Sequence, residues 1–235
     1  MLAGALPLSG PNAGPGRAYA AGMRLYFEQV NKAGGANGAQ ITLVTKDDGG
    51  RSDDTLAATK QMLAESKPLA LAGYFGNRNT SILADGAAAG GFIEQYRMNG
   101  GTAQLFANSD CDLEFLQKRL SESHMAGLSI AQVVPNPYKI TTRLSKELRD
   151  AIARSQAPDT PVSYAMMEGY INAKVIAEAA RRMGPRASRE AFTAAMEGLD
   201  GFDAGGYPVS LRTDPRVGAH VVEMSIVNAA GRLRQ

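Results

Sequence analysis

The sequence predicts an α/β protein in which parallel β-sheets are flanked by helices. Short apolar runs alternate with segments whose apolar residues recur at helical spacing, the pattern of repeated strand–helix units. Polar, glycine-rich loops follow several of these runs, where sheets of this class bind ligands. The composition agrees, because 44% hydrophobic and 20% charged residues among 235 are ordinary proportions for a globular protein.

The first third of the chain predicts three strands and two helices. The strands cover 2–8, 41–46 and 69–73, each short and apolar. The first helix runs from about Gly16 to the glycines after residue 33, and the second follows Ser52, which we expect to be its N-cap. The apolar spacing places these residues on the inner faces of the two helices: Tyr19, Met23, Tyr26, Phe27 and Val30, and then Leu56, Thr59, Met62 and Leu63.

The second half continues in the same manner. Strands are expected at 105–107, 129–134, 207–211 and 221–227, and the last of them alternates Val222, Met224 and Ile226 with polar residues. Helices are expected around 144–152 and over 164–183. The longer helix is apolar on two faces, which predicts that it is buried between other elements.

One place interrupts the alternation. Residues 82–89 and 92–98 predict two consecutive helices separated only by Gly90-Gly91, although a strand should lie between them. The sequence here is either a helical hairpin or a junction from which several strand–helix units are absent.

Charge and cysteine content exclude several classes. With 25 basic and 23 acidic residues the net charge is +2, and no basic cluster predicts a nucleic-acid partner. A single cysteine, Cys111, excludes an internal disulfide. No apolar run reaches the roughly 18 residues of a membrane-spanning helix. Residues 1–8 lack the features of a signal peptide, so we expect that the signal of an exported protein is already absent from this chain.

Two acidic and glycine-rich stretches have alternative interpretations. Gly14-Pro15-Gly16 lies where a dinucleotide-binding loop would lie, but Tyr19 occupies its third small-residue position. Asp47 and Asp48 end a predicted strand, as a ribose-binding acid would, so a dinucleotide site stays open beside a plain turn. With Asp53 and Asp54 they lack the spacing of a calcium loop, and loop solvation with helix-dipole complementation explains them better.

The sequence contains no recognisable catalytic motif. His124 and His220 have no metal-type neighbours, and the acids beside Cys111 disfavour its thiolate. Neither a Gly-x-Ser-x-Gly nucleophile nor a phosphate-binding loop is present. We therefore expect no enzyme activity, no cofactor and no metal.

Polar loops after strands are the best candidates for a binding site. They cover 9–16, 74–80 and 108–110. The second loop combines aromatic residues, a glycine, amide and hydroxyl groups and Arg78 at the start of a helix, which suits a carboxylate ligand.

An ordered series of segments resembles a known family. The segments are 7–13 with Gly16, 26–35, 43–48, 72–76, 92–105, 132–135, 164–173 and 205–209. Together they resemble the periplasmic solute-binding proteins of the leucine/isoleucine/valine-binding type, which serve ABC importers. The resemblance implies two α/β lobes joined by three crossovers, here with 1–89 as a partial N-terminal lobe, 90–134 as part of the C-terminal lobe, and 135–235 as further C-terminal-lobe and returning segments.

The resemblance also implies a site and a gap. Matching positions predict that the ligand is bound by Phe75, Gly76, Asn77, Arg78, Asn79, Thr80, Ser109 and Asp110. Family members carry more chain where this sequence has residues 87–91, so on the order of 100 residues, at roughly 30 per strand–helix–strand unit, are absent.

We therefore expect a periplasmic receptor that binds an amino acid or related small carboxylate and delivers it to an ABC permease. A cytoplasmic ligand sensor that regulates a partner and a Rossmann-like nucleotide-dependent enzyme are the alternatives.

Overall fold

The computed structural model of the chain describes residues 1–74, 86–107, 109–111, 113–155, 160–212 and 221–234. The chain forms two compact units. The first comprises Met1–Gly76 and Pro135–His220, and the second Asn77–Val134 and Val221–Gln235, so the chain passes between them three times. The division into 1–89, 90–134 and 135–235 made above remains a prediction.

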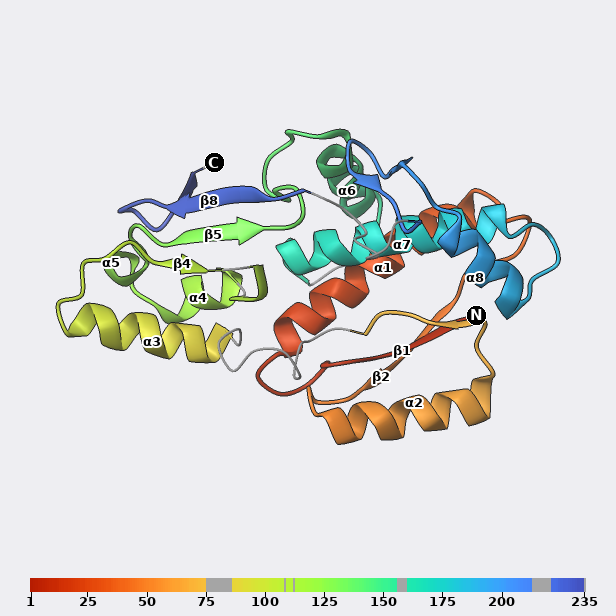
Figure 1. The fold of residues 1–235 in the computed structure, drawn as a ribbon, viewed down its shortest axis with the longest axis horizontal. Coiled ribbons are helices and arrows are strands. Elements are labelled where there is room, and N and C mark those ends of the chain that lie inside the picture. Colours follow the sequence, from red (N-terminus) through yellow and green to blue (C-terminus); the bar gives the residue numbers. More distant parts are fainter. Residues whose placement is uncertain (75–85, 108, 112, 156–159, 213–220, 235) are drawn as a thin grey trace. The chain divides into compact units, whose positions relative to one another are not determined.

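The first unit contains a parallel sheet with strand order β2-β1-β3 (Figure 1). Its strands are β1 (Leu2–Leu6), β2 (Leu43–Asp47) and β3 (Ala70–Leu71). Every residue of β1 is buried, because this strand lies between two others and is covered on both faces. The sequence of β1, Leu-Ala-Gly-Ala-Leu, is apolar throughout, which suits a strand buried on both faces.

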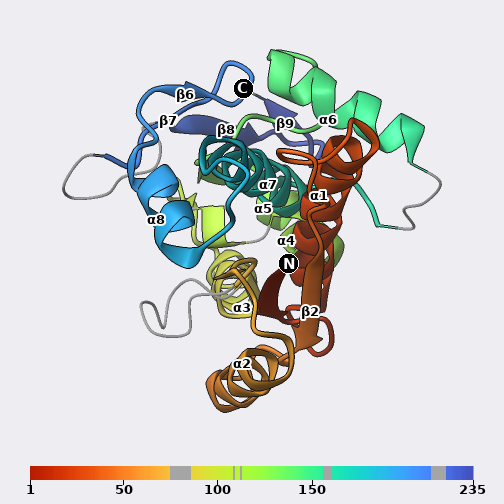
Figure 2. The same cartoon turned by 90° about the vertical axis from the view of Figure 1, so that its right-hand side faces the viewer.

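Helices cover both faces of this sheet. α2 (Ser52–Ser66) lies on one face, and α1 (Ala13–Lys32) with α7 (Tyr164–Arg182) lies on the other (Figure 1). α6 (Arg143–Arg154) and α8 (Arg189–Glu197) pack against α7, and β6 (Phe202–Asp203) with β7 (Pro208–Val209) forms a hairpin (Figure 2). Burial of both faces of α7 confirms its predicted place between other elements.

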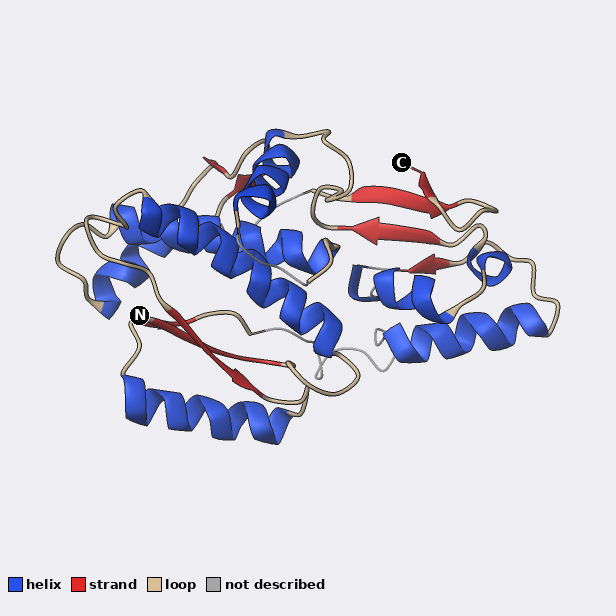
Figure 3. Cartoon of the chain, turned by 180° about the vertical axis from the view of Figure 1, so that it is seen from behind, coloured by secondary structure: helices blue, strands red, loops and turns tan. Residues whose placement is uncertain are grey.

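The second unit contains a mixed sheet with strand order β4-β5-β8-β9. Its strands are β4 (Phe106–Ala107), β5 (Ser129–Gln132), β8 (Glu223–Val227) and β9 (Leu233–Arg234), of which only β4 and β5 are parallel. Three helices lie on one side of it, α3 (Gly86–Met98), α4 (Leu113–Arg119) and α5 (Glu122–Met125) (Figure 3). η1 (Ser109–Cys111) is a short 3₁₀ turn after β4.

The α/β class with a parallel sheet flanked by helices is confirmed, and several local predictions are wrong. α1 begins at Ala13 rather than near Gly16, and α3 continues through Gly90-Gly91 as one helix. Arg51, not Ser52, is the N-cap of α2. Residues 82–85 of the predicted preceding helix lie outside the described residues.

The apolar face predicted for α2 is wrong in part. Of its predicted inner residues Met62 is buried, whereas Leu56 and Leu63 are exposed. In β8 the predicted alternation is present, with Met224 and Ile226 exposed and Ser225 and Val227 buried. Within the described residues, no helix is both long and apolar enough to cross a membrane.

Candidate functional site

The carboxyl edge of the β2-β1-β3 sheet gathers three loops. β1 leads into Ser9–Asn12 and α1, β2 leads into residues 48–51 and α2, and β3 leads towards Tyr74. Both helices therefore begin at this edge, where the unpaired N–H groups of their first turns favour anionic groups. This geometry makes the edge the candidate ligand site of the first unit.

Asp47 ties two of these loops together. Its Oδ1 accepts hydrogen bonds from the backbone N–H groups of Leu8 (2.9 Å), Ser9 (3.1 Å) and Gly49 (2.9 Å). Hydrogen bonds from the Ser9 hydroxyl and from these amides lower the pKa of the Asp47 carboxyl to about 2. Because its oxygen is engaged by the chain itself, Asp47 has a structural role at the edge of the site.

Asp48 is also engaged within the protein. It is buried, its Oδ2 accepts a hydrogen bond from the Thr55 hydroxyl (2.8 Å), and its Oδ1 accepts one from the Gly50 N–H (2.9 Å). The prediction that both aspartates serve loop solvation is therefore wrong for Asp48. Asp53 and Asp54 do lie in the first turn of α2, as helix-dipole complementation requires.

The glycine-rich start of α1 serves packing. A Cβ atom on Gly16 would collide with the Pro7 carbonyl, so this glycine lets the helix approach the chain just after β1 closely. Tyr19 is buried and turns towards α7, where its hydroxyl accepts a hydrogen bond of 2.5 Å from Asn172 Nδ2. These two packing contacts explain why Gly16 and Tyr19 occupy their positions, and a dinucleotide-binding role is not needed to explain them.

Most of the predicted ligand-binding residues lie outside the described part of the chain. They are Phe75, Gly76, Asn77, Arg78, Asn79 and Thr80. Ser109 is half-buried and opens η1, which places it directly after β4 in the second unit, and Asp110 lies in the same turn. The roles of all eight residues therefore remain predictions.

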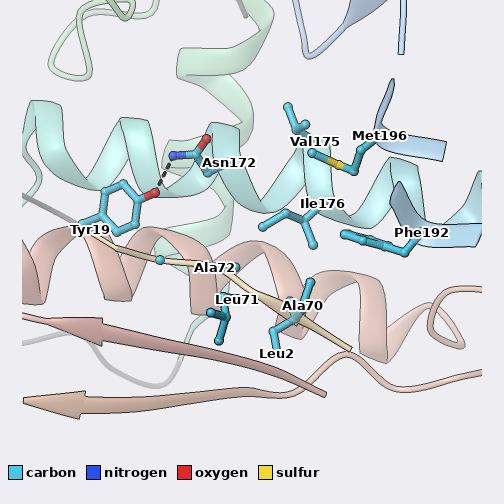
Figure 4. A pocket seen from close by; sticks show the side chains of 11 residues that line it. Leu2, Tyr19, Ala70, Leu71, Ala72, Asn172, Val175, Ile176, Phe192 and Met196 are labelled. Atoms are coloured by element: carbon cyan, nitrogen blue, oxygen red, sulfur yellow. Dashed lines mark hydrogen bonds between the residues drawn. The ribbon is translucent and has the colours of Figure 1, made fainter. Parts of the chain in front are cut away.

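A pocket of about 220 Å³ lies in the first unit beside β3 (Figure 4). Leu2 of β1 and residues 70–73 line it from the sheet, and Val175 and Ile176 of α7 with Phe192 and Met196 of α8 line it from the helices. The hydrogen-bonded pair of Tyr19 and Asn172 forms its polar end. No pattern in the sequence indicated this pocket, because its walls come from five separate segments.

Burial sets the ionisation of the tyrosines near α7. It raises the pKa of Tyr19 above its usual range, and the negative charge of Glu168 raises it further. Burial and Glu168 likewise raise the pKa of Tyr207. Both phenols are therefore neutral hydrogen-bonding groups at physiological pH. No cluster of His, Cys, Asp or Glu within the described residues is arranged to hold a metal ion.

Two stretches of the chain, residues 2–85 and 81–231, match the profile of a family described as periplasmic binding protein. The chain belongs to this family, which confirms the resemblance found in the sequence. The two matched stretches meet at residues 81–85, close to the break predicted at 87–91.

Solved structures agree with this assignment. The fold is similar to that of a substrate-binding periplasmic protein from Ralstonia solanacearum, with a TM-score of 0.91 and 26% identity over 99% of this chain and 98% of that one. It is also similar to the branched-chain amino acid transporter substrate binding protein LivJ from Streptococcus pneumoniae in complex with isoleucine, at 13% identity and a TM-score of 0.79 over 100% and 97% of the two chains. At this low identity the second likeness shows the fold alone.

The match to a curated relative covers a smaller part of the chain. An amino acid binding protein from Pseudomonas aeruginosa is 34% identical over 74 residues, which are 32% of this chain and 20% of that protein. The match thus spans about a fifth of the relative, whose length follows as about 370 residues.

Proposed function

We propose that this protein is the extracytoplasmic solute receptor of an ABC importer and that it binds an amino acid or a related small carboxylate. The observation that carries the proposal is the family match over residues 2–85 and 81–231, joined to a sheet edge where two helices begin. The relative from Pseudomonas aeruginosa is described as an amino acid binding protein, and LivJ holds isoleucine. These descriptions support the amino-acid class for this chain.

The proposed mechanism is closure of two lobes over the ligand. Asn77, Asn79 and Thr80 would donate hydrogen bonds, Arg78 would pair with the carboxylate, and Ser109 and Asp110 would contribute from the other lobe. Ligand that binds the closed state better than the open state shifts the population towards closure. The closed protein, in the periplasm, would then present its surface to the membrane permease.

Titration calorimetry against a panel of amino acids and aromatic acids tests the proposal. We expect saturable binding of at least one of these compounds. Arg78→Ala should weaken it about tenfold or more, since a charge-assisted hydrogen bond contributes about 1.5–3 kcal/mol. Arg186→Ala, at an exposed arginine of the first unit, is the matched control and should leave the affinity unchanged.

The intact mass of the purified protein is measured alongside. A mass well above 24.8 kDa is expected if a central segment belongs to the protein, and a mass near 24.8 kDa contradicts that expectation. If a folded protein, shown by cooperative unfolding, binds none of the compounds in the panel, the proposal of a small-carboxylate ligand is contradicted.

A further inference from the structure

Two strands of the second unit lead the chain to and from the first unit. β5 ends at Gln132, just before the chain passes into the first unit after Val134, and β8 begins at Glu223, just after the chain returns at Val221. The two strands pair antiparallel, with Gln132 opposite Glu223 (Figure 1). The end of β5 and the start of β8, where two of the three passages join this sheet, therefore lie side by side.

Two buried polar side chains at this place lack a hydrogen-bond partner. Gln132 is 1% exposed and Ser225 is 0% exposed. Within the described residues, neither Gln132 Oε1 nor Ser225 Oγ is hydrogen-bonded. A buried polar atom without a partner costs free energy, because it has lost its bonds to water and has gained none within the protein. Such atoms are uncommon in folded proteins, and each one calls for an explanation.

The strand register places these two side chains near each other. Ser225 lies directly opposite Ile130, and Gln132 follows Ile130 by two residues, so all three side chains point to the same face of the sheet. Diagonal neighbours of this kind are about 7–8 Å apart, a span that a long side chain can bridge. The two groups are also complementary, since a serine hydroxyl can donate the hydrogen bond that a glutamine side-chain oxygen accepts.

The surroundings of the pair are apolar. Ile130 and Val227 on the same face are 1% and 0% exposed, whereas Met224 and Ile226 point to the opposite face and are exposed. Away from water a hydrogen bond is stronger, and a missing one is more costly. Whether this single bond is made therefore affects which position of the two strand ends is favoured.

We propose that Gln132 and Ser225 form a polar latch between the two strands that lead to the first unit. In the described position the bond is not made. In a second position, reached by rotation of the Gln132 side chain with a small displacement of β5 against β8, the Ser225 hydroxyl donates to Gln132 Oε1. In the proposed receptor these two positions accompany the opening and closing of the lobes, and only this last link rests on the proposed function.

Two buried serines of the same sheet provide a matched comparison of stability. Ser129 on β5 is 2% exposed, and its hydroxyl oxygen accepts a hydrogen bond of 2.9 Å from Gln104 Nε2. Ser129→Ala should therefore lower Tm by about 2–4 °C. Ser225→Ala should leave Tm unchanged or raise it, because it removes a hydroxyl group that has no partner. An equal fall in Tm for both variants would overturn the latch, since the Ser225 hydroxyl would then already be bonded in the resting protein.

NMR relaxation dispersion on the backbone amides of β5 and β8 detects the two positions directly, in protein without any ligand. The wild type and Ser129→Ala should both show exchange on the μs–ms timescale in these strands. Ser225→Ala and Gln132→Leu should each abolish it, because either substitution removes one half of the latch. Flat profiles in the wild type, or exchange that persists in both latch variants, would overturn the inference.

The two experiments separate the latch from the proposed function. Neither Tm nor the exchange measurement needs a bound compound, so a negative result in them contradicts the latch and leaves the receptor proposal standing. The calorimetric panel bears on the receptor proposal alone.

Discussion

Two glycines allow α1 and α7 to cross with their backbones in contact. A Cβ atom on Gly22 would collide with the Met166 carbonyl, and one on Gly169 would collide with the Tyr19 carbonyl. Neither partner atom can move independently of its helix. Gly169, which lies within the predicted helix 164–183 and within the segment 164–173 of the resemblance, therefore has a direct packing role.

Gly169→Ala should destabilise the protein by about 1–3 kcal/mol, because the added methyl group forces the two helices apart. Gly14→Ala is the matched control, since a Cβ atom there meets open space. It should be neutral or stabilising by up to about 1 kcal/mol, as expected for alanine in a helix. Urea unfolding measures both, and equal midpoints for the two variants would contradict this account of the crossing.

The Asp47 carboxylate gives the loop at the sheet edge a dependence on pH. Its pKa is lowered from 3.8 to about 2 in the folded protein, so its contribution to stability is complete above about pH 4 and is lost as the pH falls towards 2. Asp47→Asn should therefore be less stable than the wild type at pH 7, and the difference should shrink between pH 4 and 2. Thermal unfolding across this range measures it, and a difference that stays constant contradicts the assignment.

At the scale of elements, side-chain caps fix where several helices begin. Thr142, Ser163 and Ser188 each accept a hydrogen bond from the N–H group three residues later, at the starts of α6, α7 and α8. Such Ser and Thr residues can be identified in a sequence. The start of α2 could not be identified in this way, because its N-cap is Arg51, which makes no side-chain hydrogen bond to the first turn. The acidic residues of that first turn supply the favourable charge instead.

Thr142→Ala should cost about 1 kcal/mol, because it leaves the Ser145 N–H, now bonded at 3.0 Å, without its partner at the start of α6. The neighbouring Thr141→Ala is the control, since Thr141 is exposed and lies outside the cap. Chemical denaturation compares them. If Thr141→Ala lowers the free energy of unfolding as much as Thr142→Ala does, the loss of the cap hydrogen bond is not the cause of the destabilisation.

At the scale of the whole molecule, the alternation of strands and helices was sufficient to predict the α/β class. The apolar pattern also identified Met62 and the buried faces of α7 correctly. It was wrong for Leu56 and Leu63, which are exposed. Periodicity reports which side chains are suited to burial, and it contains no information on whether the covering layer is present in the chain.

The candidate site was predictable only in part for a related reason. Polar residues after a strand indicate the carboxyl edge of a sheet, and the loops after β1 and β2 do lie there. The pattern cannot tell a ligand-binding oxygen from one that is bonded within the protein. Asp47 and Asp48 are of the second kind, which became evident only from their hydrogen bonds to Leu8, Gly50 and Thr55.

The most direct test of the proposed function compares one ligand with and without its charge. The amino acid that binds best in the panel is titrated calorimetrically beside its own amide, which has the same side chain but no carboxylate. If the protein recognises the carboxylate, the amide should bind about tenfold to a hundredfold more weakly, as the loss of charge-assisted hydrogen bonds predicts. Equal affinity for the acid and the amide would contradict the proposal that this protein is a receptor for small carboxylates.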